Sequence, residues 1–96
     1  MRGGWVYIMA NRRNGTLYIG VTNDIGRRAW EHREGKAEGF TKRHGLKQLI
    51  FMERYEDIGD AIAREKMLKR WSRARKVRLI ERDNPAWDDL YERLAA

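Results

Sequence analysis

The sequence predicts an α+β domain in which helices cover a small, mainly antiparallel sheet of three strands. Residues 4–10 and 16–21 are rich in β-branched and aromatic side chains and flank a strong turn, which is typical of a β-hairpin. Residues 48–55 form a third segment of strand character. Residues 57–71 and 73–82 combine capping residues with helically spaced apolar residues. The resulting order, ββαβαα, favours helices packed on one sheet.

The predicted hairpin begins the chain. Its first strand, residues 4–10, reads Gly-Trp-Val-Tyr-Ile-Met-Ala. Asn14 and Gly15 then supply the turn, because both residue types readily adopt positive φ. The second strand, residues 16–21, reads Thr-Leu-Tyr-Ile-Gly-Val. We expect the two strands to pair in an antiparallel manner.

One helix and a loop are expected after the hairpin. Asn23 or Asp24 offers an N-cap for a helix over about residues 24–34. Gly35 is a suitable residue to end it. Residues 36–47 are polar and contain two glycines, so we predict a loop before the third strand.

The second half of the chain predicts mainly helices. Asp57 or Asp60 caps a long helical region, and a second helical segment covers residues 73–82. Pro85 breaks the chain, because the residue before a proline disfavours the α conformation. Residues 87–94 are expected to form a last short helix.

Length and composition limit the class of protein. The 96 residues, 42% of them hydrophobic, suit a single domain over residues 1–96. No apolar run approaches the roughly 20 residues of a membrane span, and the N-terminus lacks the apolar region of a secretory signal. The absence of cysteine excludes disulfides, zinc–thiolate sites and thiol nucleophiles. We therefore expect a cytoplasmic protein that does not bind membranes.

The positive charge is concentrated in one stretch. The formal net charge is +7, and residues 61–82 contain nine basic and two acidic residues. This distribution is expected for a protein that binds a polyanion, although a solvated basic helix explains it equally well. A membrane-surface helix is disfavoured because the stretch lacks a wide apolar face.

Four polar residues in the first third of the chain are candidates for chemistry. Tyr7 and Tyr18 lie in the two hairpin strands, where half-buried packing is the ordinary role of a tyrosine. Arg28 and His32 are four residues apart and therefore share one face of the first helix. The alternative for this pair is a solvated face, with Asp24 as a local ionic partner of Arg28.

A fifth candidate, Glu65, lies in the long helical region. Ala61 precedes it by four residues and Leu68 follows it by three, so its neighbours on that face are apolar. A carboxylate in such an arc usually requires a cation or a metal. A surface ion pair with Lys69, four residues later, is the competing explanation.

The order and spacing of these residues resemble the GIY-YIG nuclease family. This domain occurs in homing endonucleases, incision subunits of DNA nucleotide-excision repair and Holliday-junction resolving enzymes. The chain most resembles small stand-alone bacterial proteins made of the domain alone. The similar segments are Gly4-Trp-Val-Tyr7, Tyr18-Ile-Gly-Val-Thr22, Arg28-Ala-Trp-Glu-His32, Phe40-Thr-Lys42, Ala63-Arg-Glu65-Lys66, Leu68-Lys69 and Asn84-Pro-Ala-Trp87.

One departure from the family pattern is plain. The first motif reads Trp5-Val6-Tyr7 where the family name implies Gly-Ile-Tyr, although the tyrosine is kept. The resemblance implies a GIY-YIG-like fold and a metal-dependent endonuclease that hydrolyses phosphodiester bonds in DNA. Branched, nicked and single-stranded DNA are all open as substrates.

The resemblance also implies a role for each candidate residue. Tyr7 would be the general base toward water, assisted by Tyr18, and a nearby arginine or metal would lower the pKa of the phenol from about 10. Arg28 would grip the phosphate oxygens. His32 would orient the water or relay a proton. Glu65 would hold one ion of Mg²⁺ or Mn²⁺, with water and phosphate completing the shell.

Further residues receive supporting roles from the same resemblance. Asn84 matches a position thought to support the site, although an Asn before Pro is also an ordinary turn residue. The nucleic-acid contacts are assigned to Lys42, Lys69, Arg70 and Arg73. The resemblance implies nucleic acid, and DNA in particular, as the partner, bound by a monomer or weak homodimer.

Two other functions are consistent with the same residues. The scaffold could bind DNA or RNA through its basic helices without cutting it. The other hypothesis is a protein–protein adaptor, which predicts weak, salt-insensitive interaction with nucleic acid.

Overall fold

The computed structural model describes residues 3–37 and 39–94, and it confirms the predicted α+β architecture. Three strands form one sheet in the order β2-β1-β3, with both pairs antiparallel. β1 and β3 have the predicted bounds, whereas β2 begins and ends one residue later than predicted. The strands are β1 (Gly4–Ala10), β2 (Leu17–Thr22) and β3 (Gln48–Tyr55). β1 is therefore central and β2 is an edge strand.

Side-chain caps define the start of three helices. Asp24, Asp57 and Ser72 cap α1, α3 and α4, each by accepting a hydrogen bond from a backbone N–H in the first turn. In the described part of the chain, no helix is long and apolar enough to cross a membrane. The helices are α1 (Ile25–Arg33), α2 (Phe40–His44), α3 (Ile58–Arg70), α4 (Arg73–Asp83) and α5 (Tyr91–Leu94).

The loop predicted over residues 36–47 contains a short helix, so that prediction is wrong in part. Gly39 precedes α2 with a φ of 88°, and Gly45 follows it with a φ of 64°. Glycine adopts both conformations without steric cost, and the two glycines bracket one helical turn. A five-residue helix is too short to show a hydrophobic period in the sequence. Residue 38 of the predicted loop lies outside the described residues.

The last predicted helix is shorter than expected. Residues 87–94 were expected to be helical, but α5 starts only at Tyr91. Trp87 is buried and has a positive φ of 59°, which is incompatible with a right-handed helix. Its indole N–H donates to Glu81 of α4 at 2.6 Å, so the chain turns here to bury the ring.

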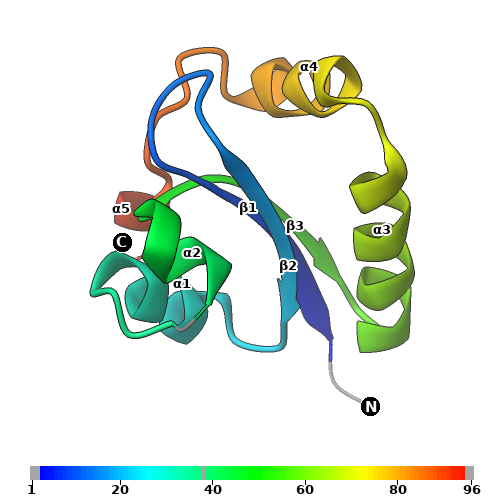
Figure 1. Ribbon diagram of the computed structural model, residues 1–96. Helices are drawn as coiled ribbons and strands as arrows, with labels where there is room; N and C mark the ends of the chain where they lie inside the picture. The colour runs from blue at the N-terminus through cyan, green and yellow to red at the C-terminus, as the bar shows by residue number, and fades with distance from the viewer. Residues whose placement is uncertain (1–2, 38, 95–96) are drawn as a thin grey trace.

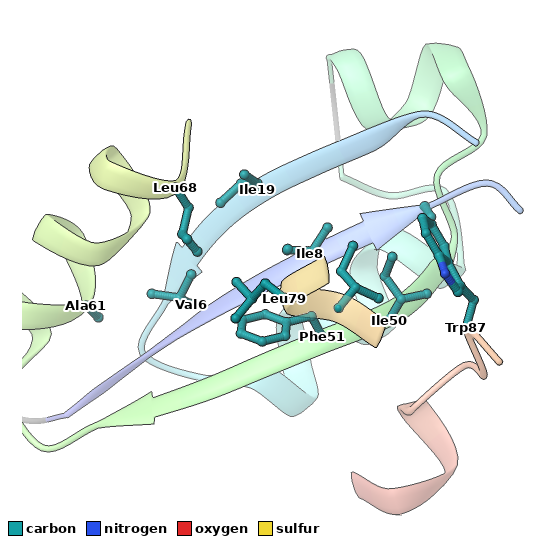
Figure 2. Close-up of a cluster of buried hydrophobic side chains, with 11 residues drawn as sticks. Val6, Ile8, Ile19, Ile50, Phe51, Ala61, Leu68, Leu79 and Trp87 are labelled. Atoms are coloured by element: carbon teal, nitrogen blue, oxygen red, sulfur yellow. The ribbon is translucent and has the colours of Figure 1, made fainter. Parts of the chain in front are cut away.

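The two faces of the sheet bury separate cores. In Figure 1, α3 lies on one side of the sheet, and α1, α2 and α5 gather on the other. The first core, covered by α3 and α4, appears in Figure 2 and includes Val6, Ile8, Ile19, Ile50, Phe51, Ala61, Leu68, Leu79, Ile80 and Trp87. The second core, covered by α1 and α5, consists of Tyr7, Met9, Ile25, Ala29, Leu46, Leu49 and Leu90.

Alternation along β1 assigns its residues to these cores. Val6 and Ile8 enter the first core, whereas Tyr7 and Met9 enter the second. Tyr7 is thereby directed toward α1, the helix that carries Arg28.

Candidate active site

The position of Tyr7 depends on a glycine in the neighbouring strand. Tyr7 is 1% exposed and is paired with Gly20 across the β1–β2 ladder. A Cβ atom at Gly20 would lie 2.5 Å from both Cζ and the hydroxyl oxygen of Tyr7. The ring therefore lies directly over the Gly20 backbone, and a side chain at that position would displace it.

Arg28 and His32 of α1 both contact the Tyr7 hydroxyl. Arg28 Nε donates to the hydroxyl oxygen at 3.3 Å, and His32 Nε2 lies 3.0 Å from the same oxygen. The two residues share one helix face because they are four apart. The structure therefore brings three of the residues singled out in the sequence into one hydrogen-bonded cluster.

The donors and acceptors of this cluster fix its direction. A guanidinium can only donate, so the Tyr7 oxygen accepts from Arg28 and its own O–H is directed to His32 Nε2. A neutral His32 then carries its proton on Nδ1, which lies 3.1 Å from Thr41 Oγ1. The result is a chain of hydrogen bonds from Arg28 through Tyr7 and His32 to Thr41.

Thr41 is a member of the site to which the sequence reasoning assigned no role. It is 4% exposed and lies in α2, the helix that was predicted as loop. The signal was its place in the Phe40-Thr-Lys42 segment of the family resemblance. Its hydroxyl fixes the orientation of the His32 ring, because it occupies the ring nitrogen that does not face Tyr7.

Burial keeps both titratable members of the chain neutral. Burial raises the pKa of the Tyr7 phenol above its ordinary value, although the hydrogen bond and charge of Arg28 act in the opposite direction. The negative charge of Glu65 raises this pKa further. Burial, reinforced by the charge of Arg28, lowers the pKa of His32 to about 4, while Glu31 opposes the change. The expected lowering of the phenol pKa by a nearby arginine is thus outweighed by burial.

Tyr18 lies beside this cluster. Its ring centroid is 6.3 Å from that of Tyr7 and 5.8 Å from that of His32. Its other neighbour is Phe40 of α2, at 6.4 Å with an interplanar angle of 24°. The Tyr18 ring therefore lies between the buried rings of Tyr7 and His32 and the more exposed ring of Phe40 on α2.

Glu31, a further residue to which the sequence assigned no role, holds the Arg28 guanidinium. Arg28 Nη1 donates to Glu31 Oε1 at 3.0 Å, and Glu31 also pairs with Arg27 at 3.4 Å. These residues line an open, polar pocket of about 550 Å³ together with Thr22, Asn23 and Asp24. The Arg28 side chain is 35% exposed, so its guanidinium is accessible from this pocket.

Glu65 approaches from the other layer of the fold. Its side chain is 14% exposed, and Ala61 and Leu68 of the same helix are buried, as the sequence indicated. The competing interpretation also holds, because Lys69 Nζ lies 3.2 Å from Glu65 Oε2. The carboxylate is therefore both largely covered and paired with a lysine that is half exposed.

The donor set suits a hard cation held by one carboxylate. Within residues 3–37 and 39–94, no group of three or more His, Asp or Glu side chains is arranged to hold a metal. Magnesium is commonly bound through one or two carboxylates, with waters and substrate phosphates as the other ligands. Glu65 fits that mode, since it supplies one carboxylate and its partner Lys69 is half exposed.

A second pocket connects the two layers around the edge of the sheet. Its volume is about 270 Å³, and it is lined by Leu17, Tyr18 and Ile19 of β2, Phe40 of α2, Lys69 of α3 and Lys76 of α4. Tyr18 and Lys69, the lysine that pairs with Glu65, therefore line the same pocket, although Tyr18 lies in strand β2 of the sheet and Lys69 in helix α3 beside it.

The side chain of Asn84 forms hydrogen bonds to the backbone of the fold and not to the residues around Tyr7. Its amide nitrogen donates to the carbonyl oxygens of Ile50 at 3.0 Å and Asp88 at 2.9 Å, and its oxygen accepts from the Asp88 N–H at 2.9 Å. These bonds fasten the C-terminal segment to β3. Asn84 thus supports the site indirectly, through the fold.

The four basic residues assigned to nucleic acid have different surroundings. Lys42 and Arg70 are exposed, and Lys69 pairs with Glu65. Arg73 donates through Nη2 to the carbonyl oxygens of residues 14 and 15, at 2.9 and 2.7 Å. Arg73 therefore ties the start of α4 to the hairpin turn, a structural role that the sequence did not suggest.

The comparisons with known proteins agree with this arrangement. UPF0213 proteins from Staphylococcus aureus strains Mu3 and N315 are each 33% identical to the chain over 81 residues, which cover 84% of this chain and 98% of theirs. The solution NMR structure of a UPF0213 protein from Bacillus halodurans is similar at a TM-score of 0.57 and 26% identity, covering 91% of this chain and 92% of that one. Residues 3–78 match the family described as the GIY-YIG catalytic domain. The chain belongs to this family, which confirms the resemblance noted in its sequence.

Proposed function

We propose that the protein is a metal-dependent endonuclease that hydrolyses phosphodiester bonds in DNA. The observation that carries this proposal is the directed hydrogen-bond chain in which the buried Tyr7 hydroxyl lies between Arg28 and a neutral His32. The Tyr7 hydroxyl thus receives a hydrogen bond from the fixed cation of Arg28 and has a neutral imidazole, His32, that can accept its proton. This arrangement supports acid–base chemistry better than it supports packing alone.

Proton movement begins at Tyr7. The water attacks phosphorus as the Tyr7 oxygen accepts its proton, and the proton of Tyr7 passes to His32 Nε2, 3.0 Å away. The bond from phosphorus to the leaving oxygen breaks in the same step, and that oxygen departs with the electron pair. The proton transfer avoids a free phenolate, which the raised pKa of Tyr7 disfavours, but forms an imidazolium that the lowered pKa of His32 also disfavours, so this ion is only transient. The His32 imidazolium formed in this step keeps its Nδ1–H directed at Thr41. Tyr18, whose ring lies close to both Tyr7 and His32, assists by orienting the water.

Charge on the phosphate is stabilised by Arg28. Its planar guanidinium suits non-bridging phosphate oxygens, and it is charged at every relevant pH. Glu31 and Tyr7 hold the group at two of its nitrogens, so it is preorganised before the substrate binds. A charge held in place this way lowers the barrier without reorganisation at the moment of reaction.

Glu65 would hold the single divalent ion, Mg²⁺ or Mn²⁺. When bound there, the ion supplies Lewis-acid stabilisation of the phosphate and the leaving oxygen. Lys69 neutralises the carboxylate in this structure, and with an ion held there its ammonium group would be available to the nucleic acid. Lys42 of α2, Arg70 of α3 and the other exposed basic residues of α3 and α4 contact the DNA backbone.

Cleavage of a labelled panel of single-stranded, duplex, nicked, flapped and four-way DNA, with RNA for comparison, tests this proposal. The reactions contain Mg²⁺, Mn²⁺ or EDTA. Wild type is compared with Tyr7→Phe, Arg28→Ala and Glu65→Ala, and Tyr55→Phe is the matched control because its hydroxyl bonds to Glu53 on β3. We expect metal-dependent cleavage in wild type and the control, with losses of about 100-fold or more in the other three variants.

Two results would contradict the proposal. Cleavage that survives in Glu65→Ala at wild-type rate would reject the single-carboxylate metal site. Salt-sensitive binding without cleavage under every metal condition would instead favour a non-catalytic nucleic-acid-binding module, which the concentration of basic residues in 61–82 also supports.

A further inference from the structure

The pocket at the edge of β2 differs in character from the polar pocket at Arg28. Its apolar and aromatic lining comes from Leu17, Tyr18 and Ile19 of β2 and Phe40 of α2. Lys69 of α3 and Lys76 of α4 add two basic side chains to the lining. In Figure 1, α2 and α3 lie on either side of β2, so the pocket bridges the two layers along this edge.

Phe40 is an aromatic surface that the fold leaves partly uncovered. Phe40 is the first residue of α2 and is 39% exposed, whereas the next residue, Thr41, is buried. Its ring stacks on Tyr18 and lies 4.2 Å from the His44 ring, centroid to centroid. An exposed aromatic side chain that adjoins a candidate catalytic tyrosine suits a planar ligand that stacks beside the scissile bond.

The two lysines of the pocket favour an anionic ligand. Lys69 is half exposed and Lys76 is partly buried, and both lie in the stretch that carries nine of the chain's basic residues. Aromatic platforms flanked by basic side chains are the means by which proteins bind single nucleotides of an unpaired strand. The volume of about 270 Å³ is small beside the roughly 300–1,000 Å³ of drug-sized ligand pockets. It therefore suits one base rather than a base pair.

We propose that this pocket is a nucleobase subsite. One unpaired base of the substrate stacks on Phe40, and the phosphate that follows it is held by Lys76 and Lys69. A base inside a duplex has both faces covered by its neighbours, so the subsite favours a substrate with an unpaired nucleotide beside the cut. The location of the cut rests on the proposed nuclease function, whereas stacking on Phe40 does not.

The experiment measures base stacking without cleavage. A short single strand in which 2-aminopurine is flanked by abasic positions, so that the base is unstacked and fluorescent before binding, is titrated into the Tyr7→Phe variant in EDTA. Stacking on the protein then quenches its fluorescence. The same background carries Phe40→Leu, which keeps an apolar side chain, or Phe40→Tyr, which keeps the aromatic face. Trp30→Leu is the matched control, since Trp30 is an equally exposed aromatic residue on α1, 42% exposed.

We expect quenching in the parent, the Phe40→Tyr variant and the Trp30→Leu control. Phe40→Leu should lose the quenching and weaken binding about tenfold, and Lys76→Ala should weaken binding and reduce its salt dependence. Unchanged quenching in Phe40→Leu, or equal loss in Trp30→Leu, would overturn the proposal. Circular dichroism of each variant separates loss of stacking from loss of fold.

The cleavage panel then distinguishes the two proposals. If wild type cleaves and Phe40→Leu loses its preference for unpaired DNA over duplex, both hold. If nothing is cleaved but Phe40-dependent quenching persists, the nuclease function fails and the subsite stands. If cleavage is normal and Phe40→Leu leaves the preference unchanged, the subsite fails and the nuclease stands.

Discussion

Gly20 and Tyr7 face each other across the β1–β2 ladder, and the tyrosine ring occupies the space where a side chain of residue 20 would be. The glycine of the second family motif thus has a physical task that concerns the first motif. It lets the phenol pass over the Gly20 backbone, with its hydroxyl in reach of Arg28 and His32.

Replacement of this glycine should therefore damage both the fold and the site. We expect Gly20→Ala to lower the free energy of unfolding by about 1–3 kcal/mol, because the added methyl overpacks the Tyr7 ring. Urea unfolding measures this change. Gly26→Ala is the matched control, since its Cβ would lie 3.8 Å from the nearest atom and alanine is favoured in a helix by about 1 kcal/mol. Equal stability of the two variants would contradict the crowding at Gly20.

The Thr41 hydroxyl should control the tautomer of His32. Thr41→Val keeps the shape of the side chain but leaves the His32 Nδ1–H without its acceptor, at a cost of about 1–3 kcal/mol in stability. It also removes the preference for a free Nε2 facing Tyr7, so cleavage should fall. Thr41→Ser should retain both properties. Nitrogen-15 chemical shifts of the His32 ring report the tautomer, and identical shifts in wild type and Thr41→Val would reject this role.

Stability should fall on acidification because of His32. Its pKa is about 4 in the folded protein and 6.5 is its ordinary value, so the unfolded chain binds the proton more readily. The contribution is fully present above pH 6.5 and is lost as the pH falls toward 4. Urea unfolding at a series of pH values measures the slope. His32→Gln should flatten the curve in this interval, and an unchanged slope would show that other groups dominate.

Asn84 should matter for stability rather than for chemistry. Asn84→Ala removes three hydrogen bonds of a buried amide, and we expect a loss of about 2–4 kcal/mol. Any folded fraction should cleave DNA at the wild-type rate per folded molecule. Asn23→Ala, an exposed position in the loop before α1, should be close to neutral. A rate loss in fully folded Asn84→Ala would instead assign Asn84 to the chemistry.

Local patterns were sufficient for most of the elements. The bounds of β1 and β3 follow from dense β-branched and aromatic residues, and Asp24 and Asp57 cap helices as their positions predict. These features are determined by neighbours in the chain. α2 was missed because a single turn between two glycines carries no period.

The candidate site was predictable in part for a similar reason. Arg28 and His32 share a helix face in any isolated helix, so their proximity could be anticipated. Their common contact with Tyr7 depends on how α1 packs on the sheet, which no local pattern specifies. The same holds for Thr41, which reaches His32 only through the turn of the chain into α2.

The sequence by itself determined the strands, the main helix caps, the basic stretch and the family membership, because each depends on residue types at short spacing. The tertiary structure decided which groups meet. Burial, set by contacts between distant segments, raised the pKa of Tyr7 and lowered that of His32. It also brought Phe40, Tyr18 and Lys69 to one pocket at the edge of β2, because side chains from four elements converge only when the sheet and helices have packed.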